Sequence, residues 1–140
     1  MNEIEVLVGH YLPEWNTPGW AHAFHGLIEL GPVALPFLEQ TFTATTDSRL
    51  RAEIVVIASQ YRSDLSLPLL GLALSDRDAD VWKAALDGLV GLASAASVAA
   101  LEQSIGRTPA GTDPSEWRTW IAEAVAQART ALQDSIRDAG

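Results

Sequence analysis

The stretch Asp76-Arg-Asp-Ala-Asp-Val-Trp-Lys-Ala-Ala-Leu-Asp-Gly-Leu-Val-Gly-Leu92 decides the fold of this 140-residue chain. Its apolar residues Val81, Ala85, Leu89 and Leu92 recur at intervals of three and four residues, which places them on one side of an α-helix. Asp78 precedes this pattern and is of the residue type that caps a helix N-terminus. The stretch therefore predicts an amphipathic helix with one buried side.

Three other segments can be aligned with the start of this helix. They begin at Trp20, Leu50 and Trp117, so that the four starts are separated by 30, 31 and 36 residues. A second apolar segment follows about a dozen residues after three of these starts, in 33–38, 65–70 and 96–101. Spacing at this scale indicates an internal repeat in which each unit is a pair of helices. The longer last step is explained by an inserted loop rich in Gly, Pro and Thr.

Two of the second segments share a Leu-Pro dipeptide at the same place, Leu35-Pro36 and Leu67-Pro68. Proline is tolerated in the first turn of a helix, so the dipeptide indicates where the second helix of each unit begins. We expect an N-terminal helix or cap in 1–19, units in 20–48, 49–79 and 80–112, and a longer C-terminal helix in 113–140. No segment alternates strictly enough to predict a strand. The alternative to a repeat is a plain bundle of five to eight helices.

Pairs of antiparallel helices repeating about every 30 residues resemble the HEAT and bacterial HEAT-like repeat family. The likeness is best in 76–92, where the family's acidic turn, valine, paired alanines and leucines have counterparts. Arg51 stands in the family's arginine position, whereas Trp82 occupies that position in the next unit. The resemblance implies an all-α, short right-handed superhelix of about three helix pairs plus the C-terminal helix. Its second helices would then line the inner face.

Charge is distributed unevenly along the chain. The net charge is −9, and residues 1–48 contain six carboxylates and no lysine or arginine. A protein that binds nucleic acid or an anionic membrane needs cations, so both classes of partner are disfavoured. A basic protein partner fits this charge better. Neither an apolar run of membrane-spanning length nor a basic leader is visible, and we expect a cytoplasmic protein.

Residues that could carry chemistry are scarce. The chain has no cysteine, which excludes disulfides, thiolate metal ligands and cysteine nucleophiles. His22, His25 and Glu29 share one helix side and could ligate a metal, but that side is expected to face solvent. We therefore expect no catalytic residues, no metal and no cofactor.

Enzymes with HEAT-like repeats supply the alternative function. An alkylpurine DNA glycosylase-like activity would use Trp82, Trp117, Trp120 and Asp113, and a lyase-like activity is a further form of this alternative. Nine cations against eighteen carboxylates argue against a DNA substrate. Tryptophans at inward helical positions are more commonly packing residues.

Protein binding is thus the expected function, since short solenoids offer extended surfaces to macromolecules. Several bacterial immunity proteins, which neutralise a toxin made by the same cell, resemble this chain in being small, acidic and HEAT-like. A cationic nuclease toxin would suit the charge. Leu65, Leu69 and Leu72 form a second apolar side in 64–75, which indicates either enclosure by neighbouring units or a binding surface. The candidate partner-binding residues are Glu39, Gln40, Thr43, Leu65, Leu69, Trp82 and Gln103.

Overall fold

A computed structural model describes residues 2–139, which form helices, turns and no strand. Residues 1 and 140, the outer ends of the expected N-terminal cap and C-terminal helix, lie outside the described residues. The prediction of an all-α protein is confirmed. Eight α-helices occur within 2–139: α1 (Glu3–Tyr11), α2 (Trp20–Leu30), α3 (Leu35–Ala44), α4 (Ser48–Gln60), α5 (Leu67–Leu74), α6 (Ala79–Leu92), α7 (Ala95–Gln103) and α8 (Pro114–Ala139).

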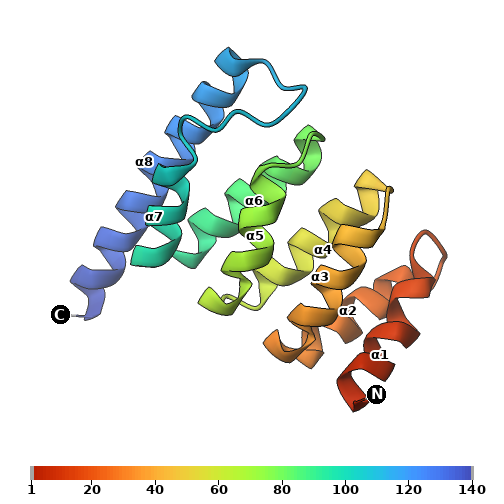
Figure 1. The fold of residues 1–140 in the computed structure, drawn as a ribbon. Helices are drawn as coiled ribbons and strands as arrows, with labels where there is room; N and C mark the ends of the chain where they lie inside the picture. Colours follow the sequence, from red (N-terminus) through yellow and green to blue (C-terminus); the bar gives the residue numbers. More distant parts are fainter. Residues whose placement is uncertain (1, 140) are drawn as a thin grey trace.

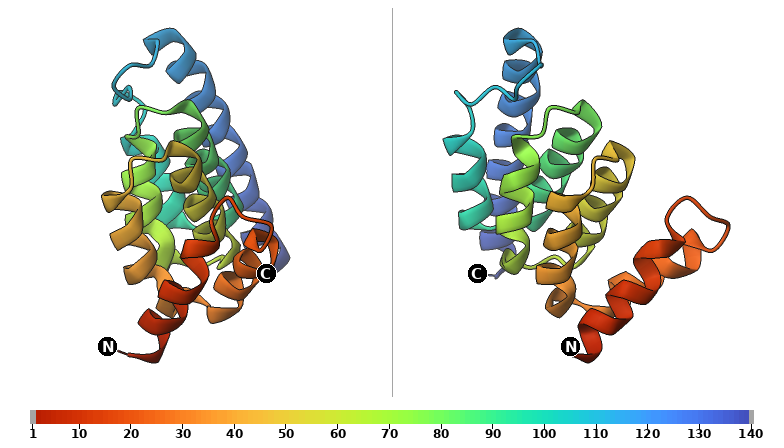
Figure 2. Two further views of the ribbon diagram at one scale, coloured as in Figure 1. Left: turned by 90° about the vertical axis from the view of Figure 1, so that its right-hand side faces the viewer. Right: turned by 45° about the vertical axis from the view of Figure 1, so that its right-hand side comes forward.

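The helices lie in two layers (Figure 1). One layer contains α2, α4, α6 and α8, and contacts join each of these helices to the next. The other layer contains α3, α5 and α7, each of which follows a first-layer helix along the chain. The N-terminal helix α1 packs against both α2 and α3, and the long helix α8 covers α6 and α7 (Figure 2). Helices that are consecutive in sequence are thus neighbours in space.

Local signals fix where the helices begin. Asp47 and Asp78 cap α4 and α6 by accepting hydrogen bonds from backbone N–H groups of the first turn. Ser94 and Ser97 form a reciprocal capping box at the start of α7. The two Leu-Pro dipeptides stand at the first residues of α3 and α5, as predicted, and each follows a short 3-10 turn, η2 (Pro32–Ala34) or η3 (Asp64–Ser66).

The core lies between the layers and along the first-layer helices. Leu50, Val81 and Trp117, three of the four aligned starts, are buried. The fourth, Trp20, is only partly buried, and so is Phe24, because α1 and the following loop cover α2 less completely than α4 and α8 cover α6. Trp120 also departs from its expected inward position, since 39% of its surface is exposed.

Hydrogen bonds complete the packing between helices. Tyr61 donates its hydroxyl to the carbonyl of Leu27 at 2.8 Å, and burial raises the pKa of Tyr61 well above its usual range. The fully buried Ser66 donates to the carbonyl of Ala58 at 2.8 Å. Among the described residues, no buried polar side-chain atom lacks a partner.

None of the helices in 2–139 combines the length and apolar character of a membrane-spanning segment.

Candidate functional site

Five of the seven candidate partner-binding residues reach the surface of the second layer. Gln40, Thr43 and Gln103 are exposed on α3 and α7, and Glu39 is partly exposed. Leu65 lies in the 3-10 turn before α5 and exposes 68% of its surface. The Thr43 hydroxyl donates to backbone carbonyls of its own helix, so its methyl group is the part available to a partner.

The other two candidates are corrected by the structure. Leu69 is 2% exposed and Trp82 is 0% exposed, so neither side chain can anchor a partner. Leu69 belongs to the second apolar side of 64–75, for which the sequence predicted either enclosure or a binding surface, and α5 packs against α4, α6 and α7 so that this residue is enclosed. Trp82 packs edge-to-face on Trp117, with ring centroids 5.2 Å apart. It is therefore a packing residue between α6 and α8.

Equivalent positions of the three second-layer helices have the same burial. Leu38, Leu70 and Leu101 are completely buried, while Gln40, Leu72 and Gln103, two residues further on, are exposed. The exposed stripe that these helices share, called here the second-helix face, consists of Pro36, Gln40, Thr43, Pro68, Leu72, Ser75, Ala99 and Gln103. None of these eight side chains carries a charge. The face offers small, apolar and amide groups to a partner.

The carboxylates of the N-terminal third do not gather on the second-helix face. Glu14 accepts a hydrogen bond from the Thr17 hydroxyl at 2.9 Å, and Glu29 is exposed on α2 in the other layer. Asp47 caps α4 and accepts a hydrogen bond from the Trp15 indole at 2.9 Å, which is the main reason that its pKa is lowered. Only Glu39 lies next to the second-helix face. The second-helix face therefore receives little charge from the carboxylates of the N-terminal third.

One further contact ties consecutive helix pairs together. Arg51 on α4 reaches the turn before α6, where its Nε lies 2.9 Å from Asp76 Oδ2 and its Nη2 lies 3.4 Å from Oδ1. Its third nitrogen donates to the carbonyl of Thr45 at 3.1 Å, and Asp76 also accepts from the N–H of Asp78 at 2.9 Å. The two side chains are only 15% and 9% exposed. This ion pair fixes the spacing between α4 and α6.

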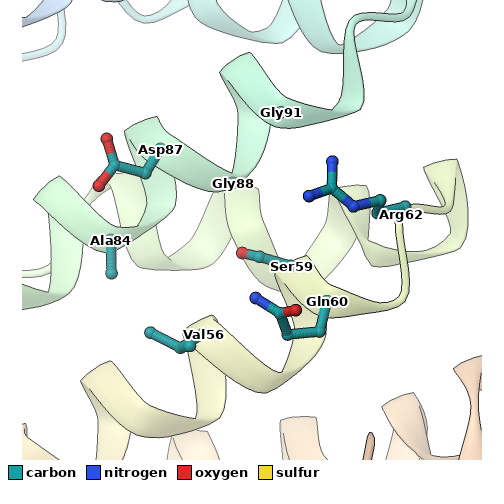
Figure 3. A pocket seen from close by; sticks show the side chains of 8 residues that line it. All are labelled: Val56, Ser59, Gln60, Arg62, Ala84, Asp87, Gly88 and Gly91. Carbon is teal, nitrogen blue, oxygen red and sulfur yellow. The ribbon is translucent and has the colours of Figure 1, made fainter.

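Two small grooves open on the first layer. One, of about 290 Å³, lies between α4 and α6 and has Gly88 and Gly91 at its floor (Figure 3). Gly88 is required there, because a Cβ atom would overlap the Ser59 hydroxyl. Arg62 lies along one end of this groove, and Asp87 is among the residues that line it (Figure 3). The other groove, of about 200 Å³, lies between α6 and α8 and shares Asp87.

The residues considered for chemistry are not assembled into a site. His22, His25 and Glu29 are exposed, as expected, and no group of three or more potential ligands in 2–139 could hold a metal ion. Of the residues that a glycosylase-like site would need, Trp82 and Trp117 are buried, and Asp113 accepts a hydrogen bond from the N–H of Ser115 at the start of α8. Of the three tryptophans, only Trp120 reaches the surface, and Asp113 is exposed as well.

Comparison of the chain with models of known protein families, with curated proteins and with solved structures found no match.

Proposed function

We propose that this protein is a non-enzymatic, HEAT-like repeat protein whose stacked helix pairs form a short right-handed solenoid that binds a protein partner. The recurrence of burial along the second-layer helices supports a repeat, since Leu38, Leu70 and Leu101 are buried and the residues two places later are exposed. The Arg51–Asp76 ion pair, which joins one pair to the next, supports it as well. Units of this kind bury their apolar sides only against neighbouring units.

The observation that carries the binding proposal is the second-helix face itself. It runs across three helices and combines exposed Leu72, which is 44% exposed, with amides and prolines. Partner surfaces are commonly depleted of charge at their centre, as this face is. The histidines and carboxylates lie elsewhere, so the face is suited to binding and not to acid–base chemistry.

The net charge of the protein would act on a partner through long-range electrostatic attraction. The charge of −9 favours encounter with a basic protein, although the docked surface would consist of uncharged groups. The specific form we propose is an immunity-type protein that neutralises a cognate basic toxin, such as a nuclease, in the cytoplasm. A cationic nuclease is suitable because its own substrate is anionic and its binding surface is therefore basic.

The experiment compares capture of the partner by three forms of the tagged protein from its native cells. In the test variant, Gln40→Arg, Leu72→Arg and Gln103→Arg place three cations on the second-helix face. In the control, His25→Arg, Gln60→Arg and Thr130→Arg place three cations at exposed positions of the first layer. Both variants receive the same number of arginines, so a difference in capture between them reflects where on the surface the arginines stand.

We expect one basic protein to be enriched by the unmodified protein and by the control, and to be lost from the test variant. Circular dichroism of both variants establishes that the helices are retained. Capture that survives in the test variant, or that is lost equally from both variants, would contradict binding through the second-helix face. Enrichment of no protein above the tag alone would contradict the binding function itself.

A further inference from the structure

The groove between α6 and α8 has the size of a single side chain. Leu86, Val90 and Ala124 form its apolar part, and Trp120 closes one side. Its volume of about 200 Å³ is below the range of roughly 300–1,000 Å³ in which drug-sized ligands bind. The groove lies in the first layer, whereas the second-helix face belongs to the other layer (Figure 1). It is therefore a separate surface.

The charged groups along the groove are both carboxylates. Asp87 projects from α6 and Glu123 from α8, and both are exposed. Neither takes part in any of the ion pairs formed within residues 2–139, which join Arg51 to Asp76, Arg129 to Glu102 and Arg137 to Asp134. Glu123 accepts a hydrogen bond from the neutral amide of Gln127 at 3.2 Å. The two carboxylates contribute negative charge to the groove, beside the ammonium of Lys83 on α6.

The wall of the groove already accepts a cation from the chain itself. The Lys83 ammonium lies 4.6 Å from the centroid of the Trp120 ring, within the range of a cation–π interaction. Trp120 is also held in place by edge-to-face packing on the buried Trp82, with centroids 6.0 Å apart. A fixed and partly exposed tryptophan is the kind of residue that dominates binding energy at protein interfaces.

We propose that this groove binds a lysine or arginine side chain of a partner protein. The aliphatic part of that side chain would lie on Val90 and on the exposed part of Trp120, and its charged end would meet Asp87 and Glu123. Long basic side chains commonly pack their stems on apolar groups and place their ends beside carboxylates, because the stems are apolar and the ends are cationic. The two carboxylates disfavour phosphate-bearing ligands in this groove. The proposal does not depend on the second-helix face, and either can fail without the other.

The test is a titration of the ¹⁵N-labelled full chain with short capped peptides, followed by NMR. The probes are pentapeptides with four glycines and a central lysine, arginine or norleucine. Norleucine provides a similar aliphatic stem without the cation. We expect the lysine and arginine peptides to produce saturable shifts of the Trp120 indole signal and of the amides around Asp87 and Glu123. The norleucine peptide should produce much smaller shifts.

Two variants of equal net charge separate the groove from general attraction. Asp87→Asn with Glu123→Gln should lower the affinity for the lysine peptide about fivefold, the effect of about two exposed ion pairs. Glu3→Gln with Glu29→Gln removes two exposed carboxylates elsewhere and should leave the affinity unchanged. The proposal would be overturned if the norleucine peptide bound as tightly as the lysine peptide, or if both variants lost the same affinity for the lysine peptide. It would also be overturned if the Trp120 indole signal showed no saturable shift.

Discussion

Removing the guanidinium of Arg51 should destabilise the protein far more than removing other cations. The Arg51→Met variant would lose two contacts to Asp76 and one to the Thr45 carbonyl, and would leave a carboxylate that is only 9% exposed without its partner. Breaking a buried pair from one side costs roughly 3–5 kcal/mol. Because both side chains retain some exposure, we expect about 3 kcal/mol, or a decrease in Tm of about 10 °C for a chain of this length.

A double-mutant cycle measures the interaction free energy between Arg51 and Asp76. Asp76→Asn retains an oxygen that can accept from the N–H of Asp78, and we expect it to cost about 2 kcal/mol because Arg51 is left uncompensated. The double variant should cost about 3 kcal/mol instead of the sum of about 5, because neither charge is then left alone. Urea denaturation followed by circular dichroism gives these free energies of unfolding.

The matched control is Arg129→Met, which removes an arginine from the ion pair with Glu102. Those side chains are 56% and 42% exposed, and pairs of this kind contribute at most about 1 kcal/mol. If Arg51→Met were no more destabilising than Arg129→Met, or if the costs at Arg51 and Asp76 simply added, the reasoning about the tie between α4 and α6 would be refuted.

Three further predictions concern packing and pH. Gly88→Ala should lower the free energy of unfolding by about 1–3 kcal/mol, and with it Tm, because the added Cβ overlaps the Ser59 hydroxyl; Ser59→Gly in the same chain should recover part of that loss, and thermal denaturation of the two variants checks this. Ser66→Ala should cost about 1 kcal/mol in urea denaturation, because the buried Ala58 carbonyl loses the 2.8 Å hydrogen bond from Ser66 and keeps only the longer one, 3.3 Å, from the N–H of Tyr61. Since the indole of Trp15 lowers the pKa of Asp47, the stability that this bond contributes is present above pH 3.8 and is lost as pH falls through the lower pKa of the folded state. The difference in Tm between the unmodified protein and Trp15→Phe should therefore be constant near neutral pH and shrink below pH 3.8; a difference that grows on acidification would contradict it.

The helices were predictable because each carries its own local signals. The Leu-Pro dipeptides, the capping Asp78 and the three- and four-residue spacing in 79–92 all act within one or two turns, and α3, α5 and α6 begin where these signals stand. The long helix expected from residue 113 onward is α8, which has 26 residues. Signals of this kind act between residues close in sequence and can be recognised without knowing any tertiary contact.

The surface was less predictable because it depends on which helices become neighbours. Leu69 lies on the second apolar side of 64–75, for which the sequence allows either enclosure or a binding surface, and only the packing of α5 against α4, α6 and α7 decides that it is buried. The groove between α6 and α8 was missed for the same reason, since Asp87 and Glu123 are 36 residues apart and only packing brings them to one groove. The sequence signal closest to this groove was Trp120, an aromatic residue that stands three positions after Trp117 and lines the groove.

Charge counts along the sequence did not locate the binding surface either. Six carboxylates precede Arg49, but Glu14 and Asp47 engage in local hydrogen bonds and Glu29 projects from the first layer. A total charge is fixed by composition, whereas its distribution over faces depends on the rotation of each helix. The uncharged character of the second-helix face could therefore be read only from the packed structure.

Hydrogen–deuterium exchange of the protein, free and bound to the partner captured from its native cells, tests the central proposal most directly. Binding across the second-helix face should slow exchange of amides in α3, α5 and α7, because docking suppresses local opening of the helices it covers. Exchange in α2 should change little. Protection confined to α2, or to the outer side of α8, with α3, α5 and α7 unaffected, would contradict the account.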